Sequence, residues 1–425
     1  MKCMIITIDC EFRMSLRTAI NFVKLSIPNI IKYNWHYFSK LKFLLKSINY
    51  THRQISDYQQ YQLKKTISAY CKLRNINVMA NENIQNFPLS VKKDYFSDFA
   101  FTSTSPRKTY KTNTGGTTGS PLTMYKSRKD LAYEAAYVDF YLMQYGVNVY
   151  LPYKAVRIRG EKVNGWYQKR GYNKYSLSSY SINSETCQQY HHFLKVFSPE
   201  VIFAYPSSLY LLCKELKERG VKEKIKAKVI VCSSECLFEH QYQLIQEYFD
   251  ASIINLFGNT EHTVFAVDVM DGNGFTVNPF YSYIENIDGK LVSTSFNDDN
   301  MPFLRYVSDD LISIDESGKV KLEGRIQDIA KGKSGQEYAL VGLIFGQHFT
   351  FFDYIKEMQI VQNYQGVIEF SYFSPQKVES CILEQTLAII SDVTKGDLDV
   401  KFDWQKSPLP RTKAGKLKFF ISNID

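Results

Sequence analysis

The middle of the chain, from residue 146 to residue 325, alternates short apolar runs with stretches in which apolar residues recur at helical spacing. Short β-branched runs bounded by polar residues are typical of buried strands, and a period of three to four residues indicates an amphipathic helix. The expected strands are Val147–Leu151, Val201–Ala204, Lys228–Cys232 and Ser252–Phe257, and the expected helices are Ser184–Phe197, Ser207–Arg219 and His240–Tyr248. This alternation predicts an α/β fold with a largely parallel sheet covered by helices.

Polar clusters follow two of these expected strands. Ser233-Ser234-Glu235 comes directly after the expected strand Lys228–Cys232. Gly258-Asn259-Thr260-Glu261 comes directly after the expected strand Ser252–Phe257. In open α/β sheets, ligands bind outside the carboxyl ends of the strands. Both clusters therefore hold candidate site residues.

The pattern ahead of this region is helical. Apolar residues recur at helical spacing from Leu16 to Ile48, with a break at Pro28, and again from Ser56 to Asn75. The stretch 13–56 contains eight basic residues and no Asp or Glu. Such helices either pack on a core or lie on an anionic membrane surface. We expect packing, with peripheral membrane association through these basic helices as the alternative.

Beyond residue 275, closely spaced glycine turns predict a β-subdomain of hairpins. The pattern changes again near residue 324. Strand-like runs over Glu357–Tyr364 and Val367–Phe373, together with a helical run over Lys377–Ile390, predict a small α+β unit. At 425 residues the chain is long for one core. We expect a large multi-subdomain N-terminal domain, residues 1–324, with parallel sheets, helices and a β-subdomain, and a small α+β C-terminal domain, residues 325–425.

Composition narrows the class of protein. The hydrophobic fraction of 44% and the charged fraction of 22% are those of a globular chain, and no uninterrupted apolar run is long enough to span a bilayer. The net charge is +9, but no recognised nucleic-acid module is visible, so we expect no nucleic-acid partner. Eight scattered cysteines and a start unlike a secretion signal favour a cytoplasmic protein. Cys232, Cys236 and His240 have metal-like spacing, although buried or incidental thiols are the expectation.

A glycine-rich segment stands out at residues 113–121, which read Asn-Thr-Gly-Gly-Thr-Thr-Gly-Ser-Pro. This composition suits a loop, and its backbone N–H groups can approach an anion without obstruction by Cβ atoms. The helical pattern that starts at Ser127 is expected to begin immediately after the loop and to add a positive dipole end. The segment predicts a phosphate site, and a flexible linker is the alternative from this stretch alone. It matches neither the Walker pattern nor the dinucleotide fingerprint.

Four more motifs follow this loop. They are Phe257-Gly258-Asn259-Thr260-Glu261, Arg305-Tyr306-Val307-Ser308-Asp309-Asp310-Leu311, Gly324-Arg325-Ile326-Gln327-Asp328 and Pro410-Arg411-Thr412-Lys413-Ala414-Gly415-Lys416. With the loop, this ordered set resembles the motifs of the adenylate-forming superfamily of acyl- and aryl-CoA ligases. Each motif alone is weak, so the resemblance depends on their order over residues 110–418. The helical N-terminus and Ser233-Ser234-Glu235 most resemble the phenylacetate-CoA ligase branch, especially its CapK-like members linked to surface polysaccharide synthesis.

The resemblance implies that ATP and Mg²⁺ activate a carboxylate as an acyl adenylate, with release of pyrophosphate. The implied ATP-binding residues are Thr114, Gly115, Gly116, Thr117, Thr118, Gly119, Ser234, Glu235, Phe257, Gly258, Asp310 and Arg325; the implied catalytic residues are Lys416, Thr260 and Glu261; and the implied hinge residues are Gln327 and Asp328. By the same resemblance, Glu261 holds Mg²⁺, Asp310 accepts hydrogen bonds from the ribose, and Lys416 places a positive charge at the α-phosphate.

The sequence departs from the family pattern at several points. Asp309 stands where the family usually has glycine, and Ser308 replaces the usual threonine. Gln327 occupies a hinge position where many relatives have aspartate or lysine. The resemblance implies a mobile C-terminal lid that rotates here, and glutamine still permits the necessary backbone change.

The acceptor of the acyl group stays open at this point. The resemblance implies CoA as the usual acceptor, whereas an amine would give an amide, including amidation of a sugar uronate. The carboxylate could be an aryl, acyl, amino or uronic acid. The alternative class of function is a catalytically inactive scaffold subunit of a polysaccharide-assembly complex. The intact Thr260, Glu261, Asp310, Arg325 and Lys416 argue against it.

Overall fold

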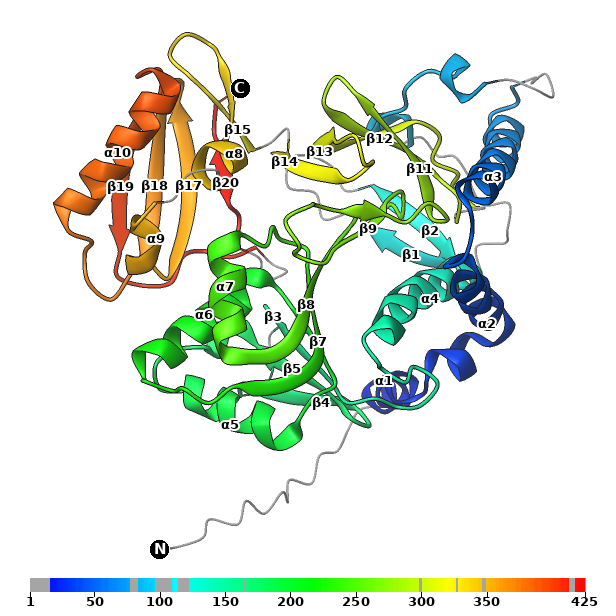
Figure 1. Cartoon of the computed structure of the whole chain (residues 1–425), viewed down its shortest axis with the longest axis horizontal. Helices are drawn as coiled ribbons and strands as arrows, with labels where there is room; N and C mark the ends of the chain where they lie inside the picture. Colours follow the sequence, from blue (N-terminus) through cyan, green and yellow to red (C-terminus); the bar gives the residue numbers. More distant parts are fainter. Residues whose placement is uncertain are drawn as a thin grey trace, which may run out of the picture.

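The computed structural model describes residues 16–76, 83–95, 109–113, 122–161, 163, 165–297, 300–325, 328–345, 349–412 and 417–424. Within these ranges the chain forms one eight-stranded sheet, two four-stranded sheets and two short two-stranded sheets, with helices around them (Figure 1). The α/β expectation is confirmed.

The eight-stranded sheet has the order β10-β9-β8-β7-β6-β3-β5-β4. Its strands are β3 (Ala155–Arg159), β4 (Tyr167–Gly171), β5 (Lys174–Ser178), β6 (Val201–Ala204), β7 (Ile225–Ser233), β8 (Phe249–Gly258), β9 (Phe265–Asp268) and β10 (Thr276–Val277). The run β5-β3-β6-β7-β8 is parallel, and antiparallel strands flank it on both sides. The largely parallel sheet is therefore confirmed.

Helices cover both faces of this sheet, as the alternation along β7 illustrates. Ile230 and Cys232 belong to a core with α5 (Cys187–Phe197), α6 (Pro206–Glu218) and α7 (Glu239–Tyr248). Val229 and Val231 belong to a second core with α2 (Asn29–Ser47) and α4 (Arg128–Gln144). Because successive side chains of a strand point to opposite faces, one apolar run supplies both cores.

The basic N-terminal region forms α1 (Leu16–Ser26), α2 and α3 (His52–Leu73), with the expected break at Pro28. Tyr37, Leu41 and Leu44 of α2 are fully buried against α4. Trp35 on the opposite side is 72% exposed. Packing on the core is confirmed for α2, and contact with a membrane stays a prediction. None of the helices within the described ranges is long and apolar enough to cross a bilayer.

The expected hairpin subdomain is an antiparallel sheet of β11 (Ser282–Ile287), β12 (Lys290–Ser295), β13 (Tyr306–Ile314) and β14 (Val320–Arg325). Asp288 and Gly289 form its first turn, and both have a positive φ, which tight hairpins require. Leu63 and Ile67 of α3 pack beneath the sheet. A separate hairpin, β1 (Thr109–Asn113) and β2 (Thr123–Ser127), leads into α4.

The last part of the chain has its own sheet, β19-β18-β17-β20, and its own core. Its elements are β15 (Ile329–Lys331), β16 (Glu337–Ala339), α8 (Leu340–Phe345), α9 (Phe351–Tyr354), β17 (Glu357–Tyr364), β18 (Val367–Phe373), α10 (Ser380–Thr394), β19 (Asp399–Gln405) and β20 (Phe420–Ser422). Figure 1 shows this unit beside α6 and α7. Lys356 Nζ lies 2.7 Å from Glu215 Oε1 of α6, and both side chains are buried.

Two expectations about local structure are wrong. Residues 147–151 form turns instead of a strand, although Val147 and Val149 are buried in the core. Their apolar character reflects burial rather than strand pairing. Helix α4 does not begin immediately after the glycine-rich loop, because β2 lies between them. Ser127 ends that strand and caps the helix through Asp130.

Candidate active site

The two polar clusters expected at strand ends lie side by side. Strands β7 and β8 are parallel neighbours, with Cys232 opposite Asn255 and Ser233 opposite Leu256. The chain leaves both strands at the same edge of the sheet. Ser234 turns away from β7 with φ +72°, a left-handed conformation that redirects the backbone there. The fold thus brings Ser234 and Glu235 next to the segment Phe257–Glu261.

Glu261 lies where three segments of the chain meet. Its Oε1 accepts a hydrogen bond of 3.1 Å from the Tyr306 hydroxyl of β13. Its backbone carbonyl accepts one of 2.9 Å from Nζ of Lys126, a β2 residue only 1% exposed. Burial raises the pKa of the Glu261 carboxyl, against the opposing effect of the Tyr306 hydrogen bond and the Lys126 charge. A partly buried carboxylate with a raised pKa is a common feature of functional sites.

The turn that carries Glu261 is held by side-chain hydrogen bonds. Asn259 Oδ1 accepts the Thr263 N–H at 2.9 Å, and Asn259 Nδ2 donates to Thr263 Oγ1 at 2.7 Å. His262 has φ +61°, and its carbonyl accepts a 3.0 Å hydrogen bond from Ser295 Oγ. Thr260, at the tip of this turn, is exposed. The turn therefore leaves Thr260 accessible to solvent at the end of the sheet.

Asp310 approaches the same edge from the hairpin subdomain. It is 7% exposed, and its N–H donates to Ser308 Oγ at 3.2 Å. Ser308 thus places a hydroxyl where the motif that this segment resembles has threonine. The negative charge of Asp310 is one of the causes that raise the pKa of Glu261, after burial. Asp310 is paired with Arg325 across β13 and β14. The structure thus brings Asp310, Glu261 and the backbone of Arg325 together.

Glu235 is positioned by the start of α6, because its Oε2 accepts the Ser207 N–H at 3.1 Å. Phe257 is half-buried, and its ring meets that of Phe275 edge to face at 5.8 Å between centroids. Gly258 ends β8, and its backbone approaches the Val264 carbonyl so closely that a Cβ would lie 3.2 Å from that oxygen. Glycine at position 258 therefore suits the tight turn that follows.

Several expected site residues lie outside the described residues: Thr114, Gly115, Gly116, Thr117, Thr118, Gly119, Gln327 and Lys416. The chain on either side of the glycine-rich loop is described, and Asn113 pairs with Thr123 across the hairpin. The loop therefore joins two adjacent antiparallel strands. Asp328 of the expected hinge is described and immediately precedes β15.

Two members of the metal-like spacing Cys232, Cys236 and His240 are packed among apolar or aromatic side chains. Cys232 is fully buried in the helix-covered core, and burial raises the pKa of its thiol to about 12. The His240 ring stacks on Phe352 with 4.7 Å between centroids, and burial lowers its pKa to about 4. Among the residues that the structure describes, no group of three or more His, Cys, Asp or Glu side chains could hold a metal ion.

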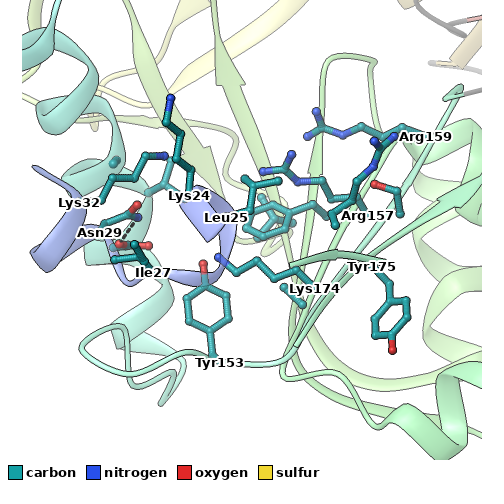
Figure 2. A pocket seen from close by; sticks show the side chains of 18 of the residues that line it. Lys24, Leu25, Ile27, Asn29, Lys32, Tyr153, Arg157, Arg159, Lys174 and Tyr175 are labelled. Atoms are coloured by element: carbon teal, nitrogen blue, oxygen red, sulfur yellow. Dashed lines mark hydrogen bonds between the residues drawn. The ribbon is translucent and has the colours of Figure 1, made fainter. Parts of the chain in front are cut away.

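A cavity of about 340 Å³ adjoins these strand ends, and the sequence patterns did not reveal it. Ser233 and Leu256, at the ends of β7 and β8, form part of its wall. Figure 2 shows the labelled Lys24, Lys32, Arg157, Arg159 and Lys174 around the cavity. Lysine and arginine side chains from α1, α2 and β3–β5 supply most of its charged lining: Lys24, Lys32, Arg157, Arg159, Arg170 and Lys174. One signal was available, because Arg157 and Arg159 are two residues apart in an otherwise apolar strand and so share a face.

Comparison with known proteins identifies the fold. No protein-family model matches the chain. The chain is 22% identical to protein CapK of Staphylococcus aureus, over 92% of this chain and 94% of that protein. Its structure matches 2-hydroxyisobutyryl-CoA ligase in the post-adenylation state with R3-HIB-AMP, with a TM-score of 0.59, 13% identity, and coverage of 94% of this chain and 91% of that one.

A second solved structure agrees. Anthranilate CoA ligase AuaEII in complex with anthranoyl-AMP matches 72% of this chain and 65% of its own, with 14% identity and a TM-score of 0.52. Likeness at such low identity shows the fold. The resemblance to adenylate-forming enzymes and to CapK, drawn from five motifs, is therefore confirmed at the level of fold and overall sequence similarity.

Proposed function

We propose that this chain, which has the adenylate-forming fold and is similar to CapK, is an ATP- and Mg²⁺-dependent carboxylate ligase. The supporting observation is the position of Glu261. Its carboxyl group is partly buried at the end of the sheet, where it accepts a hydrogen bond from Tyr306 and is influenced by the charges of Lys126 and Asp310. An acidic group with a raised pKa at this edge is suited to a cationic ligand and to a nucleotide bound beside it.

In the proposed first step, an oxygen of the substrate carboxylate attacks the α-phosphorus of ATP. The new O–P bond replaces the bond to pyrophosphate, which leaves, and an acyl adenylate results. The residues at the strand ends have separate tasks in this step. Ser234 and Glu235 border the adenine, Asp310 accepts hydrogen bonds from the ribose hydroxyls, and the exposed Thr260 hydroxyl donates to the α-phosphate as charge develops there.

The residues around Glu261 fit a magnesium ion. Mg²⁺ in nucleotide sites usually takes one or two carboxylates, with water and phosphate oxygens as its other ligands, so a single Glu261 suffices. Tyr306 donates to one carboxylate oxygen and fixes the orientation of the group. When bound, the ion neutralises phosphate charge. Lys416 supplies the second positive charge in the proposal, between the attacking carboxylate and the α-phosphate.

We further propose that residues 1–324 bind ATP and the acid and that residues 325–425 form a lid that carries Lys416. Among the described residues, the core of the C-terminal unit contains only residues from Ala330 to Phe420, which supports a separately folded body. Its contacts with α6 are partly polar: Lys214 Nζ donates to the carbonyls of Phe352 and Asp353 at 3.0 Å, and Lys356 pairs with Glu215. Polar contacts of this kind suit an interface that opens, with Gln327 and Asp328 as the hinge.

For the acceptor we propose either CoA or an amine, in capsular or surface polysaccharide biosynthesis. The names of the structural relatives, both acid-CoA ligases, support the thiol of CoA, and the similarity to CapK supports the biosynthetic setting. Formation of a thioester only when CoA is supplied would support the first acceptor. Formation of an amide without CoA would support the second.

We place the reaction in the cytoplasm, where ATP is supplied. Binding to anionic vesicles tests peripheral membrane contact through residues 13–56.

The test of adenylation is acid-dependent exchange of labelled pyrophosphate into ATP. Aryl, fatty, amino and uronic acids, the last also in phosphate-bearing forms, would be supplied in turn with Mg²⁺. We expect one class to support exchange and Lys416→Ala to reduce it by a factor of about 100 or more, because a charge acting on the transition state is lost. Lys406→Ala, at an exposed lysine that lies over Trp404, is the control and keeps exchange.

If no acid supports exchange although ATP binds, the scaffold alternative gains support. The same holds if the biological product still forms with Lys416→Ala. The intact carboxylates at Glu261 and Asp310 favour the enzyme over the scaffold.

A further inference from the structure

The cavity beside the strand ends has an unusual charge balance. Among the described residues, six cationic side chains line it, and Asp139 is the one acidic residue in its lining. Asp139 Oδ2 is already engaged, since it accepts hydrogen bonds from Asn29 at 2.8 Å and from Tyr37 at 2.7 Å. The Asp139 carboxylate therefore balances only a small part of the positive charge.

The cations come from two sides of the cavity. Lys24 belongs to α1 and Lys32 to α2, whereas Arg157, Arg159 and Lys174 belong to the sheet. Figure 2 shows the three sheet residues extending toward the side where Lys24 and Lys32 lie. Cations from two helices and from two strands of the sheet thus converge on one partly open cavity, which differs from a run of surface lysines.

Most of these cations have no ion-pair partner in the part of the chain that the structure describes. Arg170 pairs with Glu161, but no carboxylate of a described residue lies within ion-pair distance of Arg157, Arg159 or Lys174. Arg159 Nε is buried without a hydrogen-bond partner among the described residues, although the guanidinium lies over the Tyr205 ring at 5.4 Å. Lys174 Nζ lies over the Tyr153 ring at 5.0 Å.

Mutual repulsion accompanies this arrangement. Burial, followed by the charge of Arg157, lowers the pKa of both Lys174 and Arg159. Lys32 also acts on Lys174 in the same direction. Like charges held together and partly desolvated are unfavourable unless an anion completes the arrangement.

The position of the cavity indicates which ligand this anion belongs to. Its wall includes Ser233 and Leu256, directly before the proposed adenine-binding and magnesium-binding segments. A carboxylate placed for attack at the strand ends would extend its remaining atoms into this space. An alkyl or aryl acid has no second anionic group, so its tail would face the cations without pairing them. Arginine forks match phosphate oxygens well.

We propose that the acid activated by this protein carries at least one phosphate group on the part remote from its carboxylate, as a phosphorylated or nucleotide-linked sugar acid does. Arg157, Arg159 and Lys174 bind that phosphate from the sheet side, and Lys24 and Lys32 bind it from the helix side. This inference rests on the proposed carboxylate ligase activity and adds the substrate class.

The test compares matched acids in the pyrophosphate exchange assay without CoA. The probes are galacturonic acid, galacturonic acid 1-phosphate, UDP-galacturonic acid, benzoic acid and hexanoic acid. We expect kcat/KM to be at least about tenfold higher with a phosphate-bearing acid than with galacturonic acid, because a charge-assisted hydrogen bond to phosphate contributes about one order of magnitude in affinity.

Variants assign the effect to the cavity. Arg157→Gln and Lys174→Gln should each raise KM for the phosphate-bearing acid about tenfold and leave KM for ATP unchanged. Lys169→Gln is the matched control, because Lys169 is an exposed cation of β4 that does not line the cavity. Its KM for the acid should stay at the wild-type value.

Three outcomes overturn the inference. Equal exchange with benzoic or hexanoic acid refutes the substrate class and leaves the proposed ligase activity standing. Unchanged exchange in Arg157→Gln, with a raised KM for CoA in the thioester-forming step, assigns the cations to the phosphates of CoA instead. If no acid supports exchange, the wild type is titrated calorimetrically with UDP-galacturonic acid. Binding that is lost in Arg157→Gln would keep the cavity as a phosphate site although the ligase proposal fails. No binding by the wild type would refute the phosphate site as well.

Discussion

The two ends of the candidate site are the turn that carries Glu261 and the cavity lined by lysines and arginines. They have opposite charge, but in both of them burial disfavours the charged form of the side chains. At the end proposed to bind the nucleotide, burial raises the pKa of Glu261, and the nearby Asp310 adds to the effect. In the cavity, burial lowers the pKa of Lys174 and Arg159, and Arg157 adds to the effect. In both regions, side chains of like charge lie close together and are partly desolvated. The comparison suggests that each end is completed by a ligand of the opposite charge, a cation at one end and an anion at the other.

The largest expected effect separates the two ends by substrate dependence. Glu261→Gln keeps the size of the side chain and removes its charge, so adenylation should fall by a factor of about 100 to 1,000 with every acid. Arg157→Gln should instead affect only acids that carry phosphate. Pyrophosphate exchange measures this difference when both variants are supplied with one acid that carries phosphate and one that does not. A loss for Glu261→Gln confined to one acid would remove the distinction.

A smaller effect should distinguish two neighbouring carboxylates of β13. Asp310 is buried and belongs to the proposed nucleotide site, whereas Asp309 is exposed. Asp310→Asn should raise KM for ATP about tenfold or more, because a charge-assisted hydrogen bond to the ribose is weakened. Asp309→Asn should leave KM for ATP near its wild-type value. Equal KM values for both variants would show that Asp310 does not contact the nucleotide.

The smallest expected effect concerns stability without ligands, and its sign is opposite at the two ends. The folded chain keeps the Glu261 proton to higher pH than the unfolded chain, so stability falls as pH rises above the ordinary value of 4.5. The folded chain releases the Lys174 proton earlier than the unfolded chain, so stability rises with pH toward the ordinary value of 10.5.

Denaturant titrations across pH test this contrast. Glu261→Gln should be more stable than the wild type above pH 4.5, where the buried charge is removed, and Lys174→Met should be more stable below the lowered pKa of Lys174. The gain in stability of Glu261→Gln should therefore appear as pH rises past 4.5. The gain of Lys174→Met should instead disappear as pH rises past the lowered pKa of Lys174. A wild type more stable than both variants at every pH would mean that neither charge is held at a cost in free energy.

Local patterns predicted much of the scaffold. The bounds of β6, β17 and β18 match the expected runs, because each is a short β-branched or alternating segment bounded by turn residues. Residues 147–151 have the same character but form turns, since burial alone selects apolar side chains there. Strand β2 was missed because its residues, Thr123–Ser127, are polar or large and show little apolar alternation.

The candidate site likewise has one part that the sequence predicted and one part that it did not. Glu261 and Asp310 are in ordered motifs, so their neighbourhood could be anticipated from the resemblance. The cavity could not, because Lys24, Lys32 and Lys174 are far apart in the chain and each is an ordinary surface lysine by sequence. Only the packing of α1 and α2 beside the sheet edge brings them together. Contacts that arise from tertiary packing leave no local pattern to read.

The end of α1 lies very close to the sheet edge. Ser26 Oγ accepts the Tyr172 N–H at 2.7 Å, and a Cβ at Gly171 would lie 3.1 Å from the backbone of Leu25 and Ser26. A single methyl group at position 171 would therefore push the helix wall outward by a few tenths of an ångström. Protein engineers could use this position to shift α1, whose Lys24 and Leu25 line the cavity, while every charged side chain is retained, and evolution could use it to adapt one scaffold to new building blocks.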